Sequence, residues 1–167
     1  MTVTAHDARP PPDGFVRLVA SKRLRSDPDR VAAMLAADPP WEDLRAEPSE
    51  SPELRRYAID LQLRLGGDSP ALATFSKAAY LDVGNPRRTA GGWDVELQWR
   101  ASTAAPLFPV FSGTLAIVAD ELRIEGLYAP PGGLVGRVAD RMLLHIAANG
   151  TARWLLDEID RAADPSR

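Results

Sequence analysis

The hydrophobic period of this chain changes once, and that change limits what the chain can fold into. From Tyr57 to Tyr128, apolar and polar residues alternate in several separate runs, as in strands that have one wet face. From Leu134 to about Ala163 the period becomes 3.6, and no proline occurs before Pro165. The sequence therefore predicts a series of strands followed by one helix of about 30 residues, whose apolar stripe must be covered.

Turn residues separate the alternating runs, as consecutive antiparallel strands require. Gly, Asn, Asp and Pro residues close the runs at 66–68 and 84–86. A short helix from Pro28 to Ala37 is expected after the first strand, because Asp27 can cap its free amides. Residues 38–52 are expected to form a loop anchored by Trp41. The predicted strands cover residues 15–24, 57–65, 73–83, 93–100, 108–118 and 122–128.

Length and composition fit one compact domain. The chain has 167 residues, of which 45% are hydrophobic and 26% are charged. We expect a flexible tail over residues 1–13, a single domain over 14–163 and a short tail over 164–167. The first residues resemble no leader peptide and no run is apolar enough to cross a membrane, so a cytoplasmic location is expected. Arginine outnumbers lysine 18 to 2, a bias typical of GC-rich coding that favours a bacterial source.

Several kinds of chemistry are excluded by composition. The absence of cysteine rules out disulfides, iron–sulfur clusters, thiolate zinc sites and a cysteine nucleophile. The two histidines, His6 and His145, are far apart, so neither a metal site nor a cofactor is predicted. The net charge of −3 gives no general reason to bind nucleic acid. The arginine pairs at 55–56 and 87–88 are interpreted as solvated strand ends.

Short glycine and proline motifs carry a resemblance to a known superfamily. They are the run from Ser112 to Leu115, the run from Gly126 to Gly132, and Gly136 with Asp140 at the last helix. Over residues 14–163 the chain resembles the START/Bet v1-like superfamily, also called SRPBCC or helix-grip proteins, which includes polyketide cyclase-like proteins. The resemblance implies an α+β fold, in which a curved antiparallel sheet of about six or seven strands wraps around a long C-terminal helix.

The same resemblance implies that a small apolar or amphipathic molecule is held between sheet and helix. At 100° per residue, one helix stripe contains Leu134, Val138, Met142, His145, Asn149, Ala152, Leu156 and Ile159. Core packing alone would also explain the aromatic residues of the strands, so packing and cavity lining both stay open. The candidate ligand-binding residues are Ile59, Leu61, Trp93, Trp99, Tyr128, Val138, Met142, His145 and Asn149.

Three functions are compatible with these residues. The first is binding of a small hydrophobic or amphipathic ligand in a cavity between the sheet and the C-terminal helix. The second is a cyclase/dehydratase-like enzyme, in which His145 and either Tyr80 or Tyr128 would move protons. Against a catalytic role, His145 and Asn149 lie one turn apart and can simply bond each other in the core.

The third function is protein–protein interaction through the outer face of the last helix. Leu143, Ala147 and Trp154 fall almost opposite the buried stripe, which favours a homodimer or partner contact there. The glycines at 132–136 are interpreted as a tight turn and not as a phosphate loop, because the Lys-Ser/Thr pair of such a loop is missing.

Overall fold

The fold was analysed in a computed structural model. It describes residues 14–37, 39–40, 46–47, 51–65, 73–102, 110–129 and 138–164, with the backbone alone for 46–47, 61–65, 73–77 and 138–147. The N-terminal tail, Trp41 and the glycine-rich turn at 132–136 lie outside the described residues. The elements are β1 (Val16–Arg23), α1 (Pro28–Ala37), β2 (Ala46–Glu47), β3 (Leu54–Leu65), β4 (Ala73–Gly84), β5 (Arg87–Thr89), β6 (Gly92–Ala101), β7 (Val110–Val118), β8 (Glu121–Ala129) and α2 (Val138–Ala163).

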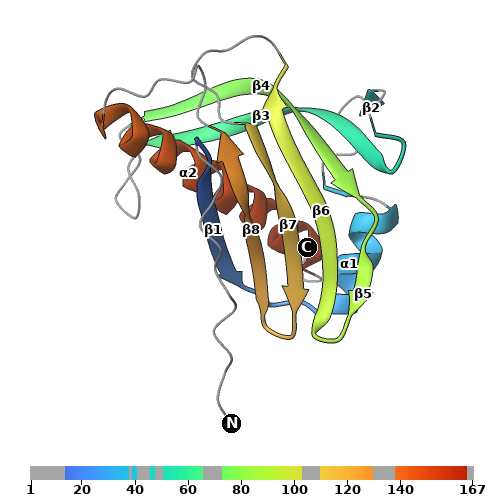
Figure 1. Ribbon diagram of the computed structural model, residues 1–167. Helices are drawn as coiled ribbons and strands as arrows, with labels where there is room; N and C mark the ends of the chain where they lie inside the picture. Colours follow the sequence, from blue (N-terminus) through green and yellow to red (C-terminus); the bar gives the residue numbers. More distant parts are fainter. Residues whose placement is uncertain are drawn as a thin grey trace.

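One curved antiparallel sheet wraps around the long helix α2 (Figure 1). Among the described residues the sheet has eight strands, in the order β1-β8-β7-β6-β4-β3-β2, with β5 paired to β6. The helix contacts β3 toward one edge of the sheet and β1 and β8 toward the other. A helix can touch both sides only if the sheet bends around it. The predicted α+β helix-grip architecture is therefore confirmed.

The local sequence signals placed most elements correctly. Helix α1 spans Pro28–Ala37 as predicted, and the Oδ1 of Asp27 accepts hydrogen bonds from the backbone N–H of Asp29 (2.8 Å) and Arg30 (3.2 Å). The short strands β2 and β5 were not predicted. They contain two and three residues, too few for an alternating pattern to be visible. Only pairing with β3 and β6 makes them strands.

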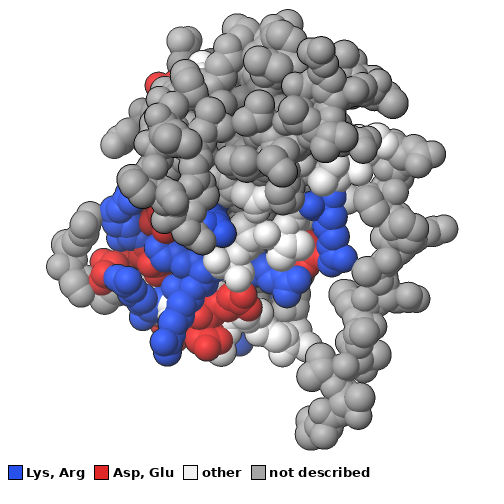
Figure 2. All heavy atoms as spheres, turned by 90° about the vertical axis from the view of Figure 1, so that its left-hand side faces the viewer, with Lys and Arg blue, Asp and Glu red and all other residues white. Residues whose placement is uncertain are grey.

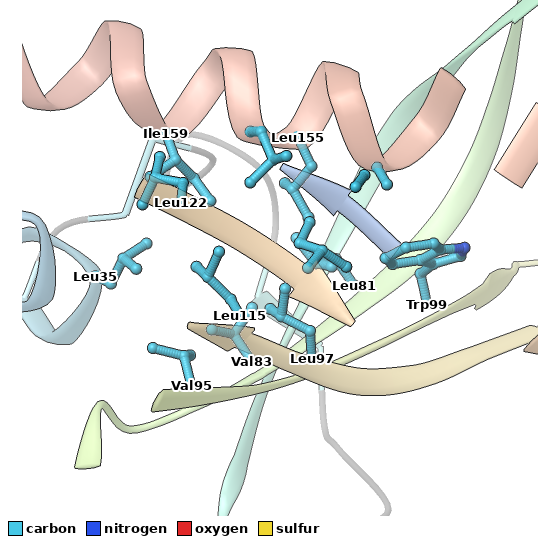
Figure 3. Close-up of a cluster of buried hydrophobic side chains, with 14 of the residues drawn as sticks. Leu35, Leu81, Val83, Val95, Leu97, Trp99, Leu115, Leu122, Leu155 and Ile159 are labelled. Atoms are coloured by element: carbon cyan, nitrogen blue, oxygen red, sulfur yellow. The ribbon is translucent and has the colours of Figure 1, made fainter. Parts of the chain in front are cut away.

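The core lies between the concave face of the sheet and the second half of α2 (Figure 3). Ala152, Leu156 and Ile159 of the predicted stripe are fully buried. Ala148 and Leu155 are fully buried too, so the buried stripe is wider than predicted, because the curved sheet covers the helix from both sides. Each fully buried leucine or isoleucine contributes roughly 1.5–3 kcal/mol to stability.

A pair of glycines determines how close the aromatic side chains come to the sheet. Gly113 and Gly126 face each other across β7 and β8, and a Cβ on either would lie 2.6–2.7 Å from the ring of Phe111. The Phe111 ring therefore lies directly on the backbone at this point. Trp99 stacks on Phe111, with 3.8 Å between ring centroids and 14° between ring planes. The two rings form an ordered stack above the glycines.

We predict that Gly113→Ala destabilises the protein by about 1–3 kcal/mol, because the added methyl group collides with Phe111 and with the carbonyl oxygen of Glu125. Urea denaturation followed by circular dichroism measures the loss. Gly91→Ala is the matched control, since nothing lies within 4 Å of its added Cβ. Equal stability losses in both variants would contradict this account of the glycine pair.

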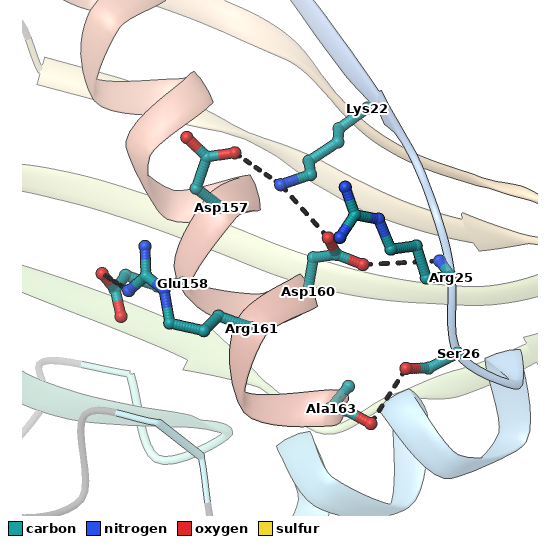
Figure 4. A network of polar contacts seen from close by, with 8 residues as sticks. All are labelled: Lys22, Arg25, Ser26, Asp157, Glu158, Asp160, Arg161 and Ala163. Carbon is teal, nitrogen blue, oxygen red and sulfur yellow. Dashed lines mark hydrogen bonds and ion pairs between the residues drawn. The ribbon is translucent and has the colours of Figure 1, made fainter. Parts of the chain in front are cut away.

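The C-terminal end of α2 is tied to β1 and α1 by polar contacts (Figure 4). The Nζ of Lys22 lies 2.6 Å from Asp157 Oδ1 and 3.1 Å from Asp160 Oδ2. The Oγ of Ser26 donates to the carbonyl oxygen of Ala163 at 2.9 Å. Burial lowers the pKa of Lys22, but the hydrogen bonds and charges of Asp157 and Asp160 outweigh burial and raise that pKa above 10.5. Contacts inside and outside the core thus fix the same half of the helix.

We predict that Lys22→Met lowers the free energy of unfolding by about 1–3 kcal/mol at pH 7, because Asp160, which is 5% exposed, loses its cation. The raised pKa means that the stabilisation by Lys22 is complete below pH 10.5 and is lost above it. Urea titrations at several pH values should therefore show the gap between wild type and variant narrowing above pH 10.5.

The control for this prediction is Arg17→Met on the same strand. Arg17 pairs with Glu125, and their side chains are 43% and 37% exposed, so little stability should be lost. A gap between wild type and Lys22→Met that widens above pH 10.5 would contradict the assignment.

Candidate functional site

The concave face of the sheet presents a row of large side chains to α2. Strand register places the members of this row side by side, one from each of β3, β4, β6, β7 and β8. All five are almost completely buried, none being more than 6% exposed. We call them the aromatic row: Tyr57, Leu81, Trp99, Phe111 and Tyr128.

The next row on the same face has smaller side chains. It consists of Ile59, Ala79 and Ala101, which pair in register on β3, β4 and β6. The face therefore steps down from Leu81 and Trp99 to two alanines. This row lies beyond the aromatic row, on the side away from α1, where β3 and β4 extend toward the start of α2 (Figure 1). We call it the alanine row.

The indole of Trp99 is the main polar feature of the aromatic row. Trp99 is 1% exposed, and its Nε1 has no hydrogen-bond partner within the described part of the chain. In Figure 3 the indole nitrogen lies at the end of the ring that points away from Leu81 and Leu155. An unpartnered buried donor of this kind costs roughly 1–3 kcal/mol. Three other buried side-chain atoms also lack a partner among the described residues: Thr151 Oγ1 on α2, Arg55 Nε and Arg123 Nε.

The structure brings together three of the predicted ligand-binding residues. Ile59, Trp99 and Tyr128 are buried on the face that α2 covers. Asn149 is half-buried on α2. The side chains of the remaining residues on β3 and in the first half of α2 lie outside the described part, so their contacts with a ligand stay predictions: Leu61, Val138, Met142 and His145.

Trp93 lies at the other end of the sheet from the alanine row. Its Nε1 donates to Asp29 Oδ1 at 2.7 Å, and the Cζ of Arg88 lies 4.9 Å from the centroid of its ring. Arg88 also donates to the same carboxylate oxygen, at 2.7 Å. These contacts fasten β5 and β6 to the first turn of α1. Trp93 and Trp99 are six positions apart along β6, or about 20 Å, so the structure does not bring the two indoles together.

Tyr80 lies on the outer face of the sheet. It stands between Ala79 and Leu81, which face α2, and strand alternation turns it the other way. The Cζ of Arg56 lies 5.2 Å from the centroid of its ring. Of the two tyrosines predicted to act with His145, only Tyr128 therefore lies on the concave face.

The outer face also carries a buried ion pair that sequence reasoning missed. Arg56 donates through Nε and Nη2 to the two carboxylate oxygens of Asp82, at 2.7 and 2.8 Å, and the residues are 8% and 5% exposed. A hollow of about 280 Å³ adjoins them, and Gln98 and Arg100 are also in its lining. The interpretation of Arg56 as a solvated strand end was wrong, because only the register of β3 and β4 places it opposite Asp82.

The predicted interaction surface on α2 is partly described. Trp154 is half-buried and packs against the core cluster, while the side chains of Leu143 and Ala147 lie outside the described residues. A homodimer through this face stays a prediction.

On the side of the molecule seen in Figure 2, basic and acidic side chains of the described residues are interspersed. Exposed pairs of this kind contribute little to stability.

Metal binding and membrane crossing are two further properties that the described ranges can be tested for. No three His, Cys, Asp or Glu side chains in them lie close enough to hold a metal ion. No helix there is both long and apolar enough to cross a membrane.

Comparison with known proteins shows the fold. No protein-family model and no curated protein matches the sequence. The Zhui aromatase/cyclase from Streptomyces sp. R1128 is 11% identical, with a TM-score of 0.55 over 89% of this chain and 93% of that one. The di-domain ARO/CYC BexL from the BE-7585A biosynthetic pathway is 13% identical, with a TM-score of 0.57 over 93% of this chain and 52% of that one. The chain thus shares the fold of these two proteins, a curved antiparallel sheet around a long C-terminal helix.

Proposed function

We propose that this protein binds a small hydrophobic or amphipathic molecule between the sheet and the first half of α2. The observation that carries the proposal is the step from Leu81 and Trp99 down to Ala79 and Ala101 on the concave face. Alanines at these two positions leave more room under the helix than residues of the size found in the aromatic row. Burial of apolar surface would drive binding, and a few polar groups would orient the molecule.

The fold gives independent support. Two solved structures of similar fold are described as aromatase/cyclases, and one of them is from a biosynthetic pathway. Those proteins share little sequence with this chain, so their chemistry does not transfer to it. What they add is that a sheet and helix arranged in this way occur in proteins that act on small organic molecules.

We predict that Ala101→Phe weakens ligand binding about tenfold or more, because its ring would occupy the space beside Ala79. Displacement of the apolar fluorescent probe N-phenyl-1-naphthylamine measures affinity, and native mass spectrometry detects a co-purifying ligand. Ala116→Phe is the matched control on the outer face, between buried Leu115 and Ile117, and should bind as the wild type does. Unchanged binding by Ala101→Phe would place the ligand elsewhere.

A cyclase/dehydratase-like activity is the second candidate. Tyr128 favours it, because it is 1% exposed and lies in the same row as Trp99. His145 would act as the acid or base, with Tyr128 holding or donating a proton to a carbonyl oxygen of the substrate.

For the enzymatic candidate we predict that Tyr128→Phe and His145→Ala each lower turnover of a poly-β-ketone substrate by roughly 10²-fold or more. Binding of the same substrate should change much less. Liquid chromatography of the products measures turnover, and Ala116→Phe again serves as the control. A wild-type protein that binds the substrate without converting it would leave binding as the function.

A further inference from the structure

We propose that the indole N–H of Trp99 recognises the ligand, and that the ligand is a flat, apolar molecule bearing a neutral carbonyl oxygen. This inference rests on the proposed function and specifies its ligand. The two tryptophans of β6 differ in the hydrogen bonding of their indole nitrogens. The Nε1 of Trp93 has a carboxylate oxygen at 2.7 Å, whereas the Nε1 of Trp99, which is 1% exposed, has no hydrogen-bond partner among the described residues. Buried donors are normally paired, and because none of the described residues supplies this partner, we assign it to the bound ligand.

The direction of this donor is fixed by packing. Trp99 is stacked on Phe111 at 3.8 Å, and Phe111 lies against the backbone of Gly113 and Gly126. Rotating the indole would break the stack, so the N–H holds one direction before a ligand arrives. In Figure 3 that direction leads away from Leu155 and the packed half of the core. A donor that is already oriented loses little freedom on binding, which favours selective recognition.

The chemistry of the donor defines the group it selects. An indole N–H can only donate, so the ligand atom beside it must accept a hydrogen bond. None of the described side chains of the aromatic and alanine rows carries a charge, so a carboxylate beside Trp99 would have no counterion among them. A ketone or quinone oxygen accepts a hydrogen bond without bringing a charge. The stacked rings and the two alanines favour a flat, apolar body attached to it.

The test uses pairs of ligands that differ only in this oxygen. Fluorenone and fluorene, or 1-tetralone and tetralin, have the same ring skeletons, with C=O in the first member and CH₂ in the second. Isothermal titration calorimetry measures each dissociation constant for wild type, Trp99→Phe and the control Trp154→Phe. We expect the ketone to bind about tenfold more tightly than its hydrocarbon in the wild type and in Trp154→Phe. The preference should fall to nearly equal binding in Trp99→Phe.

A spectroscopic readout tests the hydrogen bond directly in the unaltered protein. The chain has four tryptophans, and the indole ¹H–¹⁵N signal of Trp99 is the one missing from the spectrum of Trp99→Phe. Fluorenone should move this proton signal downfield, and fluorene should not. If Trp99→Phe does not fold, benzothienylalanine at position 99 keeps the bicyclic ring and replaces N–H with sulfur. This variant then serves both to assign the Trp99 signal and to measure binding by calorimetry.

The possible results separate the two proposals. If none of the four compounds binds the wild type, both the proposed function and this inference are overturned. If ketone and hydrocarbon bind equally well and the Trp99 signal does not respond to the ketone, this inference is overturned, while the proposed function stands. A ketone preference that persists in Trp99→Phe would also overturn this inference.

Discussion

Burial of one side of α2 in the curved sheet is the interaction on which the rest of this structure depends. The helix touches β3 toward one edge and β1 and β8 toward the other, so removing it would expose the part of the concave face that α1 does not cover. Leu155, Leu156 and Ile159 close the core at the end near α1. Lys22 with Asp157 and Asp160 fixes that same end from outside. The anchored half of α2 can therefore hold the fold while the other half covers the proposed site.

Two glycines connect this packing to the proposed recognition. Because Gly113 and Gly126 have no side chains, Phe111 lies on the backbone and Trp99 lies on Phe111. A local feature of two central strands thus determines where an indole N–H points on the concave face. The aromatic row serves stability through its buried area and, in our proposal, serves binding through one unpaired donor. The alanine row beside it would supply room for a ligand.

The buried polar groups on and next to the sheet differ in whether they have a hydrogen-bond partner. On the outer face, the buried charges of Arg56 and Asp82 satisfy each other through two hydrogen bonds. Between the sheet and α2, Trp99 Nε1 of the sheet and Thr151 Oγ1 of the helix are buried without a hydrogen-bond partner among the described residues. A folded chain normally pairs its buried polar groups, and the outer face shows that this one does so even for charges. Arg55 Nε and Arg123 Nε also lack a partner among the described residues, but the Nη atoms of both arginines make polar contacts, whereas the indole of Trp99 has a single donor. The unpaired indole therefore points to function more than the ion pair does.

Helix and strand periods, proline positions and the Asp27 cap act over a few neighbouring residues, so the sequence alone specified the elements other than the short strands β2 and β5. It predicted α1, the long strands, the helix-grip fold and three residues of the concave face: Ile59, Trp99 and Tyr128. Tertiary structure decided the strand register, which separates Trp93 from Trp99 and sets Arg56 opposite Asp82. It also decided which donors are paired. Pairing depends on atoms far apart in the chain, and a local pattern contains no information about their distance.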